Sequence, residues 1–224
     1  MIRSFLGCLF FELLAPPLIA EQNVNPDINS RYKNPDVTQW QGVFERDGRE
    51  IWDRRGDIIR HLRLQPGQAI ADVGAGTGFF SLLMAREVGA TGRVYAVDIA
   101  KNFVDASVQR AREQGLDNVI GVVNDQQSVH LAPASVDLVF ISDTYHHFEY
   151  PQATLRSIHS ALKPNGELVI IDFRRDASQS SSWVLDHVRA DNQRVITEIE
   201  AAGFELTEKL DFMQTQYYLR FRRL

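Results

Sequence analysis

The sequence almost lacks cysteine, and this absence excludes several kinds of chemistry. Cys8 is the single cysteine among 224 residues, and it lies in the apolar segment at the start of the chain. A mature chain that begins near Glu21 would contain no thiol, so it would form no disulfide, no thiolate metal site and no cysteine nucleophile. Such a protein depends on oxygen and nitrogen side chains and on any ligand that it binds.

The sequence also lacks an excess of positive charge. Its formal net charge is −5 and its isoelectric point is about 5.7. Proteins that bind nucleic acid need a basic face to neutralise phosphates, so we expect no nucleic acid as the main partner. Hydrophobic residues make up 44% of the chain, which is typical of one globular domain with a sizeable core. We expect a small-molecule partner, and no feature of the sequence indicates an obligate protein partner.

The apolar run in the first twenty residues, MIRSFLGCLFFELLAPPLIA, is too short to span a bilayer unaided. Arg3 precedes the run and Ala20 ends it, a pattern that resembles a secretory signal, whereas Glu12 and Leu18 depart from that pattern. We predict a signal or export segment over residues 1–20 and a periplasmic or secreted protein. The alternatives are an amphipathic helix on a membrane surface or a misplaced start, in a cytoplasmic or membrane-associated protein.

Residues 21–66 are predicted to form an N-terminal arm followed by helices. The stretch EQNVNPDINSRYKNPD is rich in Asn, Asp and Pro and lacks periodicity, which is typical of an extended arm. Over residues 37–62, apolar side chains recur at helical spacing, with Asp36 or Thr38 as the candidate cap of one or two helices. Trp40 is a candidate to close over a bound ligand, although aromatic residues at this spacing more often belong to the core.

Short β-rich runs alternate with helical stretches after residue 67. The predicted strands are AIADV, RVYAVDI, NVIGVV, VDLVFIS and ELVIIDF, with helical patterns near residues 79–88, 101–114 and 151–162 and a turn at KPNG. Alternating strands and helices indicate βαβ units, and hence a parallel sheet covered on both faces with right-handed crossovers. The predicted fold class is α/β with a doubly wound sheet.

The pattern changes after ELVIIDF. One helix is predicted from about Trp183 to Ala202, and it ends at Gly203. FELTEKL and TQYYLRF follow with only DFMQ between them, so these two strands must pair antiparallel.

A glycine loop, DVGAGTG, joins the first predicted strand to the helix that opens at Phe79. Such a loop places backbone N–H groups and the positive end of a helix dipole against a ligand. The order Gly74, Gly76, Gly78 does not match the G-x-G-x-x-G of dinucleotide sites, and no Lys or Arg follows before Arg86. The loop can therefore approach a ligand closely but offers no side-chain cation to a phosphate.

Acidic and amide side chains stand where the second and third strands end. Asp98 ends the second strand, where a carboxylate can accept both hydroxyls of an adenosine ribose; its alternative role is to cap the next helix. Asp125 follows the third strand, where a short polar side chain can reach an adenine amino group, and Asn124 or Gln126 are alternatives. Ligands of open α/β sheets bind at this carboxyl edge, so the coincidence indicates a nucleoside site.

Five blocks in order, DVGAGTG, YAVDI, NDQQ, DLVFISDTYHHF and LKPNGELVIIDF, give the sequence a family resemblance. In order and spacing they resemble the class I S-adenosylmethionine-dependent methyltransferases, most closely the small-molecule group that includes ubiquinone and menaquinone methyltransferases. The resemblance covers roughly residues 37–210. It implies a Rossmann-like, seven-stranded methyltransferase sheet over residues 67–224, mainly parallel with an antiparallel C-terminal strand pair.

The resemblance also implies S-adenosyl-L-methionine as the cofactor and methyl transfer to a small molecule as the activity. It places the three glycines against the methionine part of the cofactor, Asp98 on the ribose and Asp125 beside the adenine. Asp72 would support the loop, and it is alternatively satisfied within the loop itself. Asn165 stands where the family usually has glycine, a mild departure because Asn tolerates a positive φ.

The stretch SDTYHHFEYP follows the fourth predicted strand, at the edge where a methyl acceptor would lie. Asp143 and His146 are candidate bases, needed only if the acceptor must lose a proton, and Tyr145 and His147 are candidate pocket residues. The alternative for His147 is a structural histidine bonded to backbone. Adjacent histidines point in different directions and no further His or Cys is expected nearby, so we predict no metal site.

Two other functions fit parts of the pattern. A nicotinamide-dependent oxidoreductase would use the same sheet edge, but Phe79 stands where a further glycine is needed and no Tyr-x-x-x-Lys pair is present. A noncatalytic protein that keeps an adenosyl pocket would bind the cofactor without turnover.

Overall fold

The computed structural model describes residues 21–224. The predicted export segment and Cys8 lie outside the described residues. Within the described part of the chain, no helix combines the length and apolarity needed to cross a membrane.

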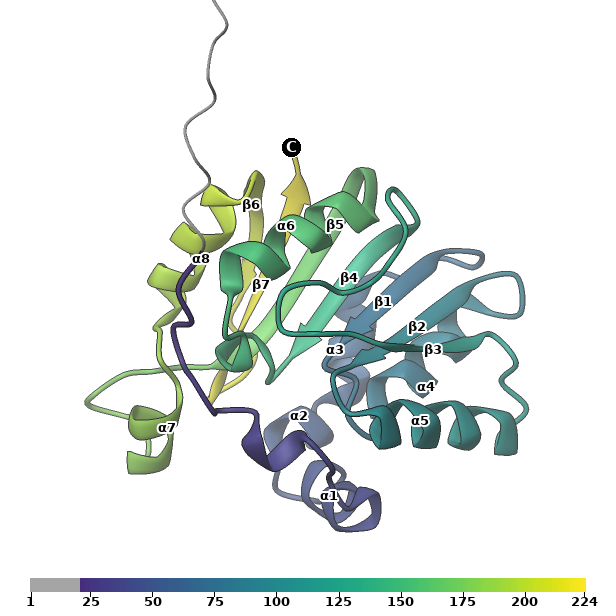
Figure 1. The fold of residues 1–224 in the computed structure, drawn as a ribbon, viewed down its shortest axis with the longest axis horizontal. Coiled ribbons are helices and arrows are strands. Elements are labelled where there is room, and N and C mark those ends of the chain that lie inside the picture. The colour runs from purple at the N-terminus through teal and green to yellow at the C-terminus, as the bar shows by residue number, and fades with distance from the viewer. Residues whose placement is uncertain (1–20) are drawn as a thin grey trace, which may run out of the picture.

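A seven-stranded mixed sheet forms the centre of the molecule, in the order β3-β2-β1-β4-β5-β7-β6 (Figure 1). The first five strands are parallel to one another, and β7 pairs antiparallel with both β5 and β6. The strands are β1 (Ala69–Val73), β2 (Arg93–Asp98), β3 (Val119–Val123), β4 (Val136–Ser142), β5 (Leu162–Phe173), β6 (Phe204–Leu210) and β7 (Gln216–Arg223). The predicted α/β fold with an antiparallel C-terminal pair is confirmed.

Helices cover both faces of the sheet, so each face has its own hydrophobic core. Apolar residues of α6 and α8 pack on one face, and those of α3, α4 and α5 pack on the other. These covering helices are α3 (Arg55–Leu62), α4 (Phe79–Val88), α5 (Lys101–Glu113), α6 (Pro151–Ala161) and α8 (Asn192–Ala201). Strands buried on both sides explain why β1 and β4 read as nearly continuous apolar runs.

Two helical segments differ from their predicted bounds. The predicted helix over residues 183–202 is wrong, because the structure has α7 (Ser182–His187) and α8 with a break between them. Asp191 causes the new start, since its side chain accepts a hydrogen bond from the Arg194 N–H at 2.8 Å and caps α8. The stretch 37–62 forms three helices rather than one or two, with α1 (Val37–Phe44) and α2 (Glu50–Asp53) before α3, and Asp36 caps α1.

The KPNG stretch lies inside β5 rather than forming a separate turn. The pairing of β4 with β5 changes register at this point, between Val136 and Leu138. Asn165 adopts a φ of 62°, the left-handed conformation that Asn tolerates better than most residues. The departure from glycine at this position is therefore accommodated by a bulge.

The strand order reverses beside β1, which has β2 on one side and β4 on the other. The chain continues from β1 to β2 and β3 on one side of β1 and then crosses to β4 on the other side. A crevice therefore opens at the carboxyl ends of these strands. The loops after β1, β2 and β4 meet there, and α1, α2 and α7 lie at the same end of the sheet (Figure 1).

Candidate functional site

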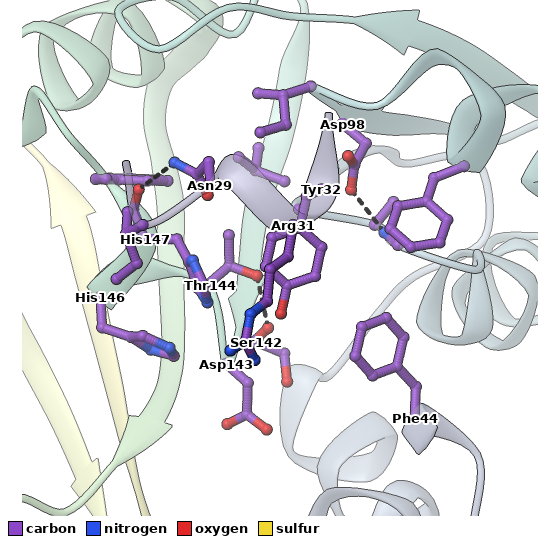
Figure 2. Close-up of a pocket in the computed structure, with 18 of the residues that line it drawn as sticks. Asn29, Arg31, Tyr32, Phe44, Asp98, Ser142, Asp143, Thr144, His146 and His147 are labelled. Carbon is purple, nitrogen blue, oxygen red and sulfur yellow. Dashed lines mark hydrogen bonds between the residues drawn. The ribbon is translucent and has the colours of Figure 1, made fainter. Parts of the chain in front are cut away.

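A cavity of about 800 Å³ occupies this crevice. Its lining comes from the carboxyl ends of β1 to β5, the N-terminal arm, α1 and α7 (Figure 2). A volume of this size is typical of a site for a cofactor or another small molecule.

The glycine loop forms one wall of the cavity, and its glycines have different surroundings. Gly74, Gly76 and Gly78 all have positive φ, at 76°, 53° and 79°. A Cβ on Gly74 would lie 2.2 Å from the Thr144 side chain, so only glycine fits between β1 and the loop after β4. A Cβ on Gly78 would lie 2.6 Å from Ser107 Oγ. Gly78 thus permits close packing of α5 and, unlike the other two, does not line the cavity.

The loop uses most of its backbone donors internally. The N–H groups of Gly74 and Ala75 donate to Val97 O at 2.8 and 3.0 Å, and that of Gly78 donates to Ala75 O at 2.9 Å. The N–H of Gly76 donates to the Asp98 carboxylate at 2.8 Å. A loop that binds pyrophosphate needs such donors free to face the ligand. This arrangement therefore suits a ligand without phosphate.

Two buried carboxylates stand beside the loop. Asp98 also accepts the Ala100 N–H at 2.9 Å, and burial raises its pKa to about 6. Asp72 accepts the Ser81 hydroxyl at 2.6 Å, and burial raises its pKa to about 7, with a further contribution from the Asp98 charge. The Asp72 contact with Ser81 shows a role in holding the loop against α4, and both carboxylates line the cavity.

Asp125, Asn124 and Gln126 all reach the cavity, so the structure keeps these three candidates together. The side chain of Asp125 is exposed and accepts the N–H groups of Gln127 and Ser128, both at 2.8 Å. These backbone donors lower the pKa of Asp125. Its carboxylate therefore shapes the turn after β3, and what it would contact in an occupied site stays a prediction.

Asp143 lies buried at the end of β4 and faces the cavity. Its Oδ2 accepts a hydrogen bond from Arg49 at 2.8 Å, whereas its Oδ1 is buried and has no hydrogen-bond partner within residues 21–224. Burial raises the pKa of Asp143, and the Arg49 charge opposes that rise. The backbone adopts a φ of 47°, an uncommon conformation for a non-glycine residue. An unpartnered buried carboxylate oxygen is suited to accept a proton or hydrogen bond from a ligand.

His146 is buried and tied to Asp172, a residue that sequence reasoning missed. Its Nδ1 lies 2.7 Å from Asp172 Oδ1, and its backbone N–H donates to Asp172 Oδ2 at 3.0 Å. Burial lowers the pKa of His146, but the Asp172 carboxylate outweighs burial and the pKa is raised overall. Only Nε2 of His146 remains available to a ligand in the cavity.

His147 lines the cavity as predicted for a pocket residue, but its environment is unusual. Its Nδ1 is buried and has no hydrogen-bond partner in the described part of the chain, and burial together with nearby imidazoles lowers its pKa to about 2. These contacts do not support the alternative prediction, a structural histidine whose ring is hydrogen-bonded to backbone.

A third histidine, His187 of α7, lies beside His146 and His147. The ring of His187 is 5.1 Å from that of His146 and 5.2 Å from that of His147, centroid to centroid. The expectation that no further histidine joins the pair is therefore wrong. The reason is tertiary, because α7 follows β5 and returns to the same edge of the sheet.

Tyr145 does not lie where the sequence predicted. The predicted pocket residue is buried in the core, and its hydroxyl donates to Glu198 of α8 at 2.8 Å. Tyr145 and His146 are successive residues of a short 3₁₀-helix (Tyr145–His147), so they point to different sides. The side that faces the cavity belongs to the histidines.

The N-terminal arm covers the cavity, a role that its composition did not reveal. Asn29 donates to His147 O at 2.9 Å and to Glu149 Oε1 at 3.1 Å, so the arm is fastened to the loop after β4. Tyr32 packs against Trp40 with ring centroids 4.9 Å apart, and both line the cavity. The signal that the sequence offered for this role was a polar, Asn-rich stretch that precedes the aromatic residue Tyr32. Trp40 is thus a cavity residue, as proposed, within an aromatic cluster.

Comparisons with known proteins point in one direction. A family model described as "Methyltransferase domain" matches residues 64–218. The ubiquinone/menaquinone biosynthesis C-methyltransferase UbiE of Blochmanniella pennsylvanica is 34% identical over 124 residues, which cover 55% of this chain and 48% of that protein. The 2-phytyl-1,4-naphtoquinone methyltransferase of Trichormus variabilis is 29% identical over 150 residues, covering 62% of each chain.

Among solved structures, a SAM-dependent methyltransferase from Aquifex aeolicus superposes with a TM-score of 0.74. It is 22% identical, and the match covers 84% of this chain and 99% of that chain. This likeness shows the fold. The chain spans about half the length of several curated relatives that it matches, including the first two.

Proposed function

The chain belongs to the methyltransferase domain family, and we propose that it transfers the methyl group of S-adenosylmethionine to a small acceptor bound in the same cavity. The observation that supports the proposal is the pairing of two carboxylates across that cavity. Asp98 stands at the ribose position of the fold, and Asp143 presents an unpartnered oxygen on the side of β4.

The residues around the glycine loop fit this cofactor. Asp98 and Asp72 are acceptors for hydroxyl and ammonium groups, and no cation of the loop is present to bind a phosphate. The internally used N–H groups argue against a nicotinamide dinucleotide for the same reason. We assign Gly74, Gly76 and Asp72 to the methionine side and Asp98 to the ribose. Asp125 or its neighbours face the adenine.

The remaining part of the cavity is aromatic and would receive the acceptor. Tyr32 comes from the N-terminal segment, and Phe173 and Trp183 come from the end of β5 and from α7. Relatives named for quinone methylation carry the same kind of domain. We therefore propose an aromatic acceptor with an ionisable O–H or N–H group.

S-adenosylmethionine supplies an electrophilic methyl group on a sulfonium. The acceptor lone pair forms the new bond to the methyl carbon while the carbon–sulfur bond breaks, and its electron pair remains on sulfur. Asp143 Oδ1 takes the proton that the acceptor loses, and Arg49 holds the carboxylate in place. The arm and aromatic residues exclude water and align the reactants, which is the main contribution a protein makes to such a displacement.

The test measures methyl transfer from labelled S-adenosylmethionine to a panel of phenols, hydroquinones and aromatic amines. We expect Asp143→Asn to lower kcat by about 100-fold or more while cofactor affinity changes less than about threefold. Asp137→Asn is the matched control, because Asp137 is also ion-paired, to Lys163 at 2.9 Å, but lies outside the cavity lining. Saturable cofactor binding without turnover on the panel would favour the noncatalytic alternative. No binding of S-adenosylmethionine would refute the proposal.

A further inference from the structure

Three histidines converge at the acceptor side of the cavity. His146 and His147 belong to the 3₁₀-helix after β4, and His187 ends α7. One nitrogen of each ring lies within 4.8 Å of the other two. Each of the three residues also lines the cavity, so the cluster is open to small ligands.

The contacts of His146 define which nitrogen is available. Its Nδ1 lies 2.7 Å from the Asp172 carboxylate, so Nδ1 carries the proton and Nε2 carries the free lone pair. Asp172 is itself held by the N–H groups of His146 and Phe173, at 3.0 and 2.8 Å. A carboxylate that orients an imidazole in this way is the usual outer support of a metal-binding histidine.

The contacts of His147 provide a second, independent observation. Its Nδ1 is buried and has no hydrogen-bond partner among the described residues. A buried polar atom of this kind normally has a partner, because leaving it unpaired costs about 1 to 3 kcal/mol. A metal ion at the centre of the cluster would supply that partner.

We propose that His146, His147 and His187 together bind one divalent transition metal ion, with an open fourth position toward the cavity. Three imidazole nitrogens suit zinc, copper, iron or nickel and disfavour magnesium and calcium, which prefer oxygen ligands. A tetrahedral zinc site needs nitrogens about 3.3 Å apart, as follows from Zn–N distances of about 2.0 to 2.1 Å. The separations of up to 4.8 Å therefore require the side chains to close by at most about 1.5 Å.

The open position would accept an oxygen or sulfur atom of a ligand in the cavity. Three protein ligands and one exchangeable position are typical of zinc sites that act on ligands, whereas structural zinc sites are closed by four protein side chains. This inference goes beyond the proposed methyl transfer and does not depend on it, since the cluster is complete without a cofactor or an acceptor.

The experiment titrates the chelator-treated full-length protein with ZnCl₂ by calorimetry, with no S-adenosylmethionine present, and counts bound metal by mass spectrometry. We expect one zinc per chain and no comparable binding of MgCl₂. His187→Ala should weaken zinc binding by at least about 100-fold, and Asp172→Asn, which weakens the outer support of His146, by about 10- to 100-fold. His130→Ala is the matched control, because its exposed imidazole contacts Asp125 outside the cluster, and it should bind zinc like the wild type.

His147→Gln keeps a polar side chain of similar size. As a second ligand variant, it keeps the test valid if His187→Ala does not fold. Circular dichroism and the thermal midpoint of each variant establish that it is folded. The proposal is overturned if the wild type binds no stoichiometric zinc, or if folded His187→Ala and His147→Gln bind it as tightly as the wild type. Neither result would bear on cofactor binding, which is measured separately.

Discussion

Replacing Asp98 with asparagine should alter how the stability of the protein changes with pH and should lower its cofactor affinity. The Asp98 carboxylate is 7% exposed and accepts two backbone N–H groups, from Gly76 and Ala100. Asparagine has the same shape but carries no charge, and its NH₂ group cannot accept a hydrogen bond, so one of the two backbone N–H groups loses its partner. That loss is the same at every pH, so the way in which the stability difference from the wild type changes with pH reports the effect of the negative charge.

The stability effect follows from the pKa of Asp98, which burial raises to about 6. The unfolded chain has an ordinary value of about 3.9, so between pH 4 and 6 the folded state holds a proton that the unfolded state has lost. This group therefore makes the free energy of unfolding fall as pH rises through that window. A rise of about 2 pKa units corresponds to a cost of about 3 kcal/mol once the group is ionised. We expect the free energy of unfolding of ligand-free Asp98→Asn, relative to the wild type, to be about 2 to 3 kcal/mol higher at pH 7.5 than at pH 4, because asparagine carries no charge to bury. The lost hydrogen bond lowers it by about 1 to 3 kcal/mol at both pH values.

The affinity for the cofactor should fall. Ribose hydroxyls that donate to a carboxylate form charge-assisted hydrogen bonds, each worth about 1.5 to 3 kcal/mol, so losing one weakens binding by about 10- to 150-fold. Calorimetry with S-adenosylmethionine and S-adenosylhomocysteine at pH 7.5 measures the affinity, and urea unfolding at pH 4 and 7.5 measures the stability. Unchanged affinity of a folded variant would remove Asp98 from the ribose site. A stability difference from the wild type that is the same at pH 4 and pH 7.5 would refute the assigned cost of burying the charge.

Three further predictions concern the loop, the arm and the N-terminus. Gly74→Ala should destabilise the protein by about 1 to 3 kcal/mol more than Gly48→Ala in thermal unfolding. Both glycines have positive φ, but only at Gly74 would the new Cβ collide with a side chain. Equal losses of stability would mean that the loop moves to relieve the collision. Asn29→Ala removes the three side-chain hydrogen bonds that fasten the arm over the cavity. The variant should have a higher KM in the methyl-transfer assay and should be cleaved faster by proteases within residues 21–36. Unchanged cleavage would contradict a closed arm. We propose that residues 1–20 direct export and are removed, so N-terminal sequencing of the secreted or periplasmic protein should begin at Glu21, whose carboxylate accepts the Gln152 and Ala153 N–H groups; an intact N-terminus would contradict cleavage.

The sequence predicted the sheet well because its signals are local. Buried parallel strands give short apolar runs, and turn residues separate them from helices of regular period. β1 and β6 begin and end where the runs AIADV and FELTEKL do. The helix over residues 183–202 was predicted wrongly because the apolar residues around the break, Val188 and Ala190, are buried and do not mark an interruption. The cap at Asp191 was the one local signal of a new helix.

The sequence predicted which residues reach the cavity where a side chain lies directly at the end of a strand. Asp98 ends β2 and Asp143 directly follows β4, and in a parallel sheet those ends meet at one edge. Tyr145 was assigned to the pocket on the same ground. It lies two residues after Asp143, at the start of a tight 3₁₀-helix, and its side chain is buried in the core. Proximity to a strand end therefore predicts position along the edge but not the direction of a side chain.

The two halves of the cavity differ in how the chain builds them. The half that we assign to the cofactor consists of the β1 loop and the residues at the ends of β2 and β3, so its chemistry can be predicted from motifs at fixed spacing. The acceptor half depends on α7 and the N-terminal arm, segments whose positions are set by tertiary contacts. His187 is 41 residues from His146, and no spacing rule for metal ligands connects them. Substitutions in α7 should consequently alter what the cavity accepts, whereas substitutions at the ends of β2 and β3 should alter whether the cofactor binds at all.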